Sequence, residues 1–191
     1  MAHISIIGTG NMGQAIAAVA RKGGNSVQLI GSADTDQQVT GDVVVLAVPY
    51  PAVVDVLASR GESFAGKVVV DITNPLDFST FDSLTVPADS SSAAGLAEAL
   101  PESRVLKAFN TNFAATLAAR AVGDQPTTVL VAGDDAEAKA LLIDIVAAAG
   151  LRGVDAGSLR RARELEAVGF LQLTLAAGEK IGWAGGFAVT P

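Results

Sequence analysis

Three glycines near the start of the chain restrict its fold more than any other feature. Gly8, Gly10 and Gly13 follow a short apolar run at residues 3–7 and lead into an Ala-rich segment at residues 11–22. A strand, a glycine turn of this spacing and a helix form the pyrophosphate-binding turn of dinucleotide-binding α/β proteins. The first glycine permits the tight turn, the second leaves room for the pyrophosphate, and the third lets the helix pack closely on the strand. The amino-terminal end of this helix is therefore expected to bind a dinucleotide.

The rest of the chain alternates short β-branched runs with Ala-rich segments. The β-branched runs predict further strands at residues 27–30, 42–48, 67–72, 104–108, 127–131 and 151–154. The Ala-rich segments predict helices at residues 51–59, 91–100, 113–121, 134–149 and 159–177. This alternation predicts an α/β fold: a Rossmann-type, doubly wound, mainly parallel sheet with a small C-terminal helical extension. We assign residues 1–155 to a dinucleotide-binding Rossmann domain and residues 156–191 to a C-terminal helix and tail that pack on it and form a dimer.

The dimer is predicted from the second half of the last helix. Residues 170–175 carry apolar side chains around more than one helix face. A helix on the surface of a monomer needs only one apolar stripe, so the excess is expected to be buried by a second copy of the chain. Packing of these side chains against the protein's own sheet is the competing explanation.

Composition excludes several classes of function. The 191 residues are 50% hydrophobic and carry a formal net charge of −7, so nucleic acid and anionic membrane surfaces are poor partners. There is no cysteine, which excludes disulfides and thiolate chemistry. We expect no membrane span and no targeting segment, because no apolar run is long enough and no basic region precedes one. A cytoplasmic location is predicted.

The end of the second strand bears on the choice between NADP and NAD. An NAD site usually presents an acidic residue there, which binds the adenosine ribose. This chain instead has the small, neutral pair Gly31 and Ser32, which favours NADP because no carboxylate repels a 2′-phosphate. Asp34 keeps the NAD interpretation open, since it lies about twenty residues after Gly13, the usual spacing.

Residues for acid–base, nucleophilic or metal chemistry are missing from the sequence. The single histidine, His3, begins the first strand, at the end opposite the glycine turn. Without another histidine or any cysteine, no Ser-His-Asp or Cys-His arrangement can form, and no metal-ligand spacing is present. Three arginines near residue 160 are interpreted as an exposed helix face that pairs with Glu164 and Glu166. We therefore predict neither a catalytic side chain nor a metal site.

Loops after three of the predicted strands offer amides, hydroxyls and aromatic rings instead. Ligands of open α/β sheets bind beyond the carboxyl ends of the strands, where these loops lie. Such groups suit hydride transfer between two bound ring systems, which depends on positioning rather than on proton transfer. The loops are Pro49-Tyr50-Pro51, Thr73-Asn74-Pro75 and Phe109-Asn110-Thr111-Asn112.

Five segments, in this order along the chain, resemble one family. In these five segments the chain is similar to the coenzyme F420-dependent NADP oxidoreductases. The reductase domain of the STEAP metalloreductases shares much of the same pattern. Two departures are visible: Ala33 stands where family members often have arginine, and residues 31–41 are too few for the usual helix between the second and third strands. The segments are ISIIGTGNMG at 4–13, AVPY at 47–50, VDITNP at 70–75, KAFNT at 107–111 and VAGDD at 131–135.

The resemblance implies a homodimer that binds NADP(H) on the glycine turn and stacks the deazaflavin coenzyme F420, a small-molecule substrate, on the nicotinamide. Two alternatives stay open: an NADPH-dependent flavin reductase similar to the STEAP group, and a dinucleotide-sensing protein without catalysis. The implied cofactor-binding residues of the turn are Gly8, Thr9, Gly10, Asn11, Met12 and Gly13. Thr9, Gly10, Asn11 and Met12 would contact the pyrophosphate, and Ser32 would contact the 2′-phosphate. Ala47, Val48, Pro49 and Tyr50 would line the nicotinamide, and Asn74, Pro75, Asn110, Thr111 and Asn112 would border the deazaflavin.

Overall fold

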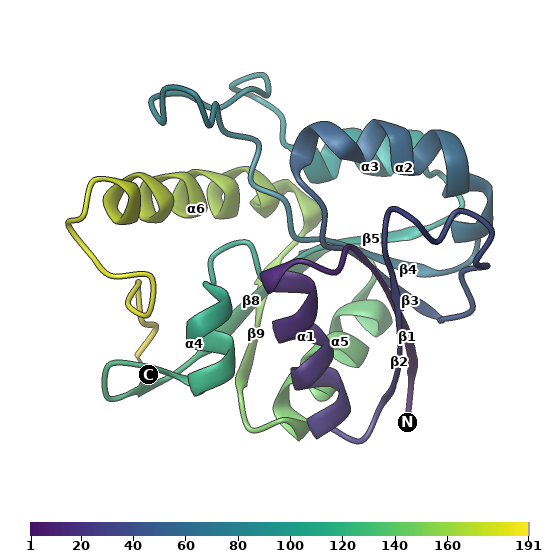
Figure 1. The fold of residues 1–191 in the computed structure, drawn as a ribbon, viewed down its shortest axis with the longest axis horizontal. Helices are drawn as coiled ribbons and strands as arrows, with labels where there is room; N and C mark the ends of the chain where they lie inside the picture. The colour runs from purple at the N-terminus through teal and green to yellow at the C-terminus, as the bar shows by residue number, and fades with distance from the viewer. Residues whose placement is uncertain (191) are drawn as a thin grey trace.

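The computed structural model describes residues 1–190 and contains the α/β sheet that the sequence predicts. Its seven strands run in the order β2-β1-β3-β4-β5-β8-β9 (Figure 1). The first five are parallel to one another, β8 runs antiparallel to β5, and β9 is parallel to β8. In this order the strands are β2 (Ser26–Ile30), β1 (His3–Ile7), β3 (Val43–Leu46), β4 (Val68–Asp71), β5 (Arg104–Lys107), β8 (Thr128–Gly133) and β9 (Arg152–Gly157).

Helices cover both faces of the sheet (Figure 1). One apolar cluster joins α1 (Asn11–Lys22), α4 (Ala114–Ala119) and α5 (Ala136–Ala148) to one face. A second cluster joins α2 (Val53–Arg60) and α3 (Ser92–Ala99) to the other face. The doubly wound arrangement is therefore confirmed, and the longest helix, α6 (Ala162–Ala177), forms the C-terminal extension.

The central strands are buried on both faces, as their sequence predicts. All residues of β3 and β4 are buried, including Val44 and Val70, whose exposed fraction is 0%. Full burial of a valine side chain stabilises a fold by about 1.5–3 kcal/mol. These strands therefore hold the loops that follow them in fixed positions at one edge of the sheet.

Short elements differ from the expectation. The helix predicted at 113–121 ends early because Arg120 adopts the left-handed conformation, with φ of 60°. A small hairpin of β6 (Ala121–Val122) and β7 (Gln125–Pro126) follows it, and strands of two residues carry no periodic signal in the sequence. Single 3-10 turns precede or follow helices at η1 (Tyr50–Ala52), η2 (Gly61–Phe64) and η3 (Leu159–Arg161). The segment between β2 and β3 contains no helix, as its length predicts.

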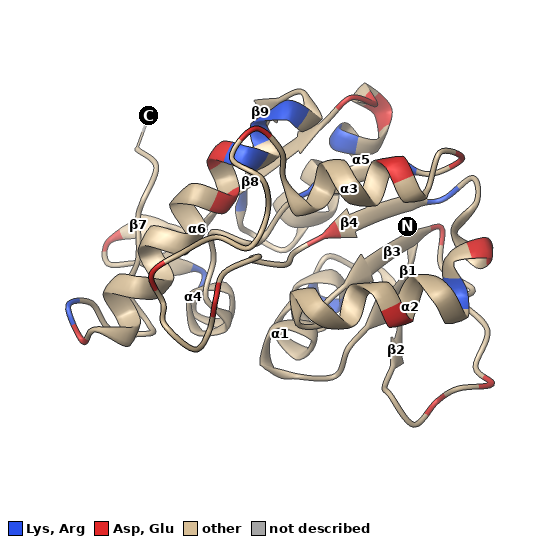
Figure 2. Ribbon diagram, turned by 90° about the horizontal axis from the view of Figure 1, so that it is seen from above, with Lys and Arg blue, Asp and Glu red and all other residues tan. Residues whose placement is uncertain are grey.

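Helix α6 lies beside the carboxyl ends of the strands, away from α2 (Figures 1 and 2). Arginines and glutamates gather at its amino-terminal end (Figure 2), where Arg161 and Arg163 each contact Glu164. After α6 the chain turns back, and Trp183 packs on Phe113 with 5.1 Å between ring centroids. Among the described residues 1–190, no helix is long and apolar enough to cross a membrane.

Candidate active site

The glycine turn lies between β1 and β3, where the order of the strands in the sheet reverses direction. Helices α1 and α2 leave neighbouring strands, β1 and β3, toward opposite faces, and ligands of such sheets bind at this switch point. Gly8 has φ of +112°, and a Cβ there would lie 2.1 Å from the carbonyl oxygen of Ala47. A Cβ on Gly13 would lie 2.0 Å from the carbonyl oxygen of Gly8. Close backbone packing therefore requires glycine at both positions.

Gly10 differs from these two glycines. Its backbone is extended, with φ of −71°, and a Cβ there would meet nothing within 4 Å. The protein itself does not need a glycine at this position, so the open space is available to a ligand. No side chain caps α1, whereas Ser91 caps α3 and Asp135 caps α5. The first N–H groups of α1 are thus left for an anion at the glycine turn.

A cavity of about 500 Å³ extends from this turn toward the end of β2. Gly31 lies against Thr9, which joins the end of β2 to the glycine turn. Asp34 folds back on the same strand end, and its Oδ2 accepts a hydrogen bond of 2.8 Å from the N–H of Gly31. The predicted residues that line this cavity are Gly8, Thr9, Gly10, Ser32, Ala47, Val48 and Pro49.

A second cavity, of about 380 Å³, begins on the other side of the turn. Its walls come from the start of α1, the loops after β4 and β5, α4, α6 and the tail. Phe109 and Trp183 give it aromatic surface, so a flat ring system can bind there. The predicted residues that line it are Asn11, Met12, Asn74, Asn110 and Asn112.

Two of these asparagines form a reciprocal pair. The Nδ2 of Asn74 donates to the carbonyl oxygen of Asn110 at 2.9 Å, and the Nδ2 of Asn110 donates to Oδ1 of Asn74 at 3.1 Å. Asn110 also donates to the carbonyl oxygen of Leu165 on α6 at 2.8 Å. Gly169 lets α6 approach the pair, because a Cβ there would lie 2.3 Å from Oδ1 of Asn74. Helix α6 therefore fixes one wall of the second cavity.

Strained backbone positions this pair. Phe109 is buried and has φ of +61°, a left-handed conformation that is rare for a bulky residue. Such strain persists only where the surrounding structure imposes it, and it gathers at functional sites. Here it turns the chain after β5 so that Asn110 contacts both Asn74 and α6.

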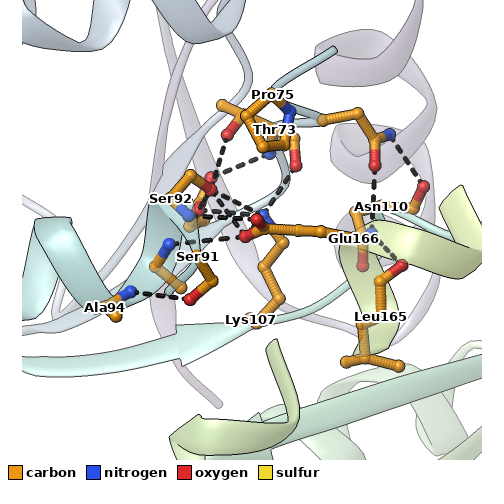
Figure 3. Close-up of polar contacts among 12 residues, drawn as sticks. Thr73, Pro75, Ser91, Ser92, Ala94, Lys107, Asn110, Leu165 and Glu166 are labelled. Carbon is orange, nitrogen blue, oxygen red and sulfur yellow. Dashed lines mark hydrogen bonds and ion pairs between the residues drawn. The ribbon is translucent and has the colours of Figure 1, made fainter. Parts of the chain in front are cut away.

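A buried ionic cluster beneath this wall was not predicted from the sequence (Figure 3). The Nζ of Lys107 lies 2.9 Å from Oδ2 of Asp71 and 2.8 Å from Oε1 of Glu166, and all three side chains are at most 2% exposed. Lys107 also donates to the carbonyl oxygen of Thr73 at 2.6 Å. Ser92 donates its backbone N–H to Glu166 at 3.0 Å, so the carboxylate of α6 also caps α3. The cluster therefore joins β4, β5, α3 and α6.

The expectation that Glu166 lies on an exposed face is wrong. Glu166 is 1% exposed and belongs to the same helix stripe as Ala162, Leu165 and Gly169, which are all buried. The spacing of this stripe along α6 is the signal that could have placed Glu166 inside. Burial acts to raise the pKa of Asp71, but the charge of Lys107 and hydrogen bonds from Ser92 and Thr73 outweigh it. They hold the pKa below its usual range.

Four predicted site residues line neither cavity. Gly13 is buried under the turn, and Pro75 is buried. Thr111 accepts a hydrogen bond of 3.1 Å from Gln172 of α6 through its carbonyl oxygen. Tyr50 lines a separate cavity between α2 and α3. Leu173 and Trp183, which do line the second cavity, were not predicted there. Leu173 belongs to the part of α6 that was assigned to a dimer face, and the tail that carries Trp183 has no clear sequence pattern.

His3 lies away from both cavities, as expected. Its ring nitrogens contact the hydroxyl of Ser26 at 2.7 Å and that of Thr40 at 2.8 Å. Within residues 1–190 there is no group of three His, Cys, Asp or Glu side chains that could hold a metal ion.

The fold and the two cavities define a dinucleotide-binding α/β protein with space for a second ring beside the dinucleotide. A family profile described as "NADP oxidoreductase coenzyme F420-dependent" matches residues 30–75. The F420-dependent NADP reductase of Methanocaldococcus jannaschii is 33% identical over 156 residues, which cover 78% of this chain and 69% of that protein. The chain belongs to the family of F420-dependent NADP reductases.

Two further comparisons bear on this assignment. The crystal structure of an Arthrobacter sp. FB24 protein, assigned as an F420 dependent NADP-reductase, superimposes with a TM-score of 0.86 at 25% identity and covers 100% of both chains. The metalloreductase STEAP3 of Rattus norvegicus is 32% identical over 133 residues. That match covers 70% of this chain but 26% of STEAP3.

Proposed function

We propose that this protein is an NADPH-dependent F420 reductase, which transfers a hydride between NADP(H) and the deazaflavin coenzyme F420. The observation that carries the proposal is the position of the two cavities on either side of the glycine turn. Gly10 lines the first cavity, and its neighbours Asn11 and Met12 line the second. A dinucleotide bound along the turn in the first cavity would thus present its nicotinamide to a ring bound in the second.

The residues of this chain act by binding, orientation and exclusion of water. Thr9, Gly10 and the first turn of α1 would hold the pyrophosphate, with Ser32 at the adenosine end. The Asn74–Asn110 pair and Phe109 form a rigid wall for the second ring. NADPH supplies the hydride, and no proton donor is needed at the transferred atom, so positioning accounts for the catalysis.

Reduction of an ordinary flavin is the second candidate, supported by the similarity to STEAP3. A flavin and a deazaflavin share the shape of their ring system, so the second cavity accommodates either. A dinucleotide sensor without turnover is the third candidate. These functions differ in a single assay that combines the protein with NADPH and with oxidised F420, FMN or FAD in turn.

The assay follows the nicotinamide and deazaflavin absorbance bands together. We expect NADPH oxidation with F420, loss of both bands at equal rates, and little turnover with FMN or FAD. Faster turnover with FMN or FAD would favour the flavin reductase. Tight NADPH binding without turnover of any acceptor would favour the sensor. Gly10→Val serves as the control without dinucleotide binding.

A homodimer through α6 and the tail is part of the proposal. Leu171 is 51% exposed on α6, and Val168 on the same helix is also exposed. The tail adds Trp183 and Phe187, which are both exposed and apolar. Burial of such a surface by a second copy is favourable, since soluble monomers rarely expose large apolar patches. The division into a domain of residues 1–155 and a dimerising extension of residues 156–191 stays a prediction, as does the cytoplasmic location.

A further inference from the structure

We propose that Arg60, at the carboxyl end of α2, recognises the 2′-phosphate of NADP(H) and sets the preference of this protein over NAD(H). The inference rests on the proposed function and names the residue that determines its cofactor choice. It assigns the positive charge at the adenosine end to α2 instead of to the loop after β2.

The first argument is the position of Arg60. The cavity of about 500 Å³ that Gly10 lines is also lined by Ser32, Thr35, Ser59 and Arg60. Of the described residues that line this cavity, Arg60 alone carries a positive charge. The hydroxyls of Ser32 and Thr35 are suitable partners for phosphate oxygens, whereas the hydroxyl of Ser59 already donates to the carbonyl oxygen of Asp55 at 2.8 Å. The guanidinium of Arg60 adds charge-assisted hydrogen bonds to a phosphate.

The second argument is that the charge of Arg60 is held in place but not neutralised. Its guanidinium donates to the backbone carbonyl oxygens of Asp34, Thr35 and Gln37, with 3.2 Å to that of Thr35. Within residues 1–190, no carboxylate lies within 4.0 Å of it. Three carbonyl contacts fix the side chain and leave other N–H groups of the guanidinium available. A preorganised, unpaired cation of this kind favours an anionic ligand.

The third argument concerns the loop itself. Residues 31–41 contain two aspartates and no lysine or arginine, so the loop cannot neutralise a 2′-phosphate. Arg60 contacts the carbonyl of Asp34, two residues after Ser32, and two residues span at most about 7 Å. Its charge is therefore close to any phosphate bound at Ser32. Asp34 and Asp55 lie at or near this cavity and oppose the phosphate, so the preference for NADPH is expected to be modest.

Two small probes isolate the 2′-phosphate. Adenosine 2′,5′-bisphosphate and adenosine 5′-monophosphate differ only in that group, and their affinities can be measured by calorimetry without F420. We expect the wild type to bind the bisphosphate more tightly. Arg60→Gln should weaken bisphosphate binding by about 10- to 100-fold and change monophosphate binding by less than about twofold. Arg60→Lys should retain part of the preference, because it keeps the charge but not the fork of donors.

Arg21→Gln is the matched control, since it removes an exposed arginine at the far end of α1 and should leave both affinities unchanged. An equal loss for both probes in Arg60→Gln would overturn the proposal and leave Arg60 only a role in holding the loop. Unchanged affinities would overturn it as well. If the bisphosphate preference depends on Arg60 but F420 is not reduced, the cofactor assignment stands and the proposed reaction fails.

Discussion

Lys107 on β5 and Glu166 on α6 form an ion pair of 2.8 Å in which the side chains are 0% and 1% exposed. Leu165, the residue before Glu166 in α6, accepts a hydrogen bond through its carbonyl oxygen from Asn110 in the wall of the second cavity. A charged contact inside the protein therefore sets the position of the helix that closes the site. Burial makes this contact costly to break, because a single remaining charge has no water around it.

Lys107→Met should strongly destabilise the protein. The substitution leaves Asp71 and Glu166 buried without their cation, which costs about 3–5 kcal/mol in free energy of unfolding. Denaturant unfolding would measure it. Lys139→Met is the matched control, because its partner Asp155 has a side chain 52% exposed, and an exposed pair contributes about 1 kcal/mol or less. Equal losses in the two variants would contradict the importance of the buried cluster.

Asp71 should make stability depend on pH in the acid range. Its pKa is lower in the folded protein than in the unfolded chain, where it is about 3.9. Its ionised form therefore stabilises the fold fully above about pH 4, and this contribution is lost as the pH falls through the folded pKa. The difference in melting temperature between wild type and Asp71→Asn should be large at pH 7 and shrink toward pH 3. A difference that stays constant over this range would argue against the proposed linkage.

The glycine turn offers a matched pair of variants. Gly10→Val should fold normally, because its backbone is extended and the space around it is open, yet lose dinucleotide binding, because the side chain fills that space. Gly8→Ala should instead lower the melting temperature, since φ is +112° and the new Cβ would collide with Ala47. Thermal unfolding and calorimetry with NADPH separate the two effects. Unchanged NADPH affinity in a folded Gly10→Val variant would place the dinucleotide elsewhere.

Introducing charged side chains on α6 tests whether the protein forms a dimer through this helix. Leu171→Glu combined with Leu175→Glu should yield monomers, because two carboxylates would have to be buried in the interface. Val54→Glu is the control, since Val54 is 66% exposed on α2, away from α6. Light scattering reports the mass of each variant. A monomeric wild type would remove the dimer from the account.

Local patterns were enough to predict the sheet and the glycine turn. Gly8 and Gly13 are needed for backbone packing that follows directly from a strand–turn–helix of this spacing. The valine runs of β3 and β4 are typical of strands buried on both faces, and the structure confirms this burial. Asn74 and Asn110 follow predicted strands, and the family resemblance implies that both border one ring site; they do contact each other.

Contacts between distant segments could not be predicted in the same way. Lys107 and Glu166 are 59 residues apart in the sequence, and each alone resembles an ordinary surface charge. Trp183 lies in a Gly-rich tail without periodicity, and only the packing on Phe113 brings it to the second cavity. Arg60 likewise reaches the loop after β2 only because α2 packs beside it.

Hydride transfer itself can be followed with NADPH that carries deuterium at C4 of the nicotinamide. The 4R- and 4S-labelled forms would be incubated separately with the protein and oxidised F420, and the reduced coenzyme analysed by mass spectrometry. The account predicts that one of the two forms, and only that one, delivers a deuterium to the deazaflavin ring, because the site holds the nicotinamide in a single orientation. Reduced coenzyme without deuterium from either form, or no reduced coenzyme at all, would contradict direct hydride transfer.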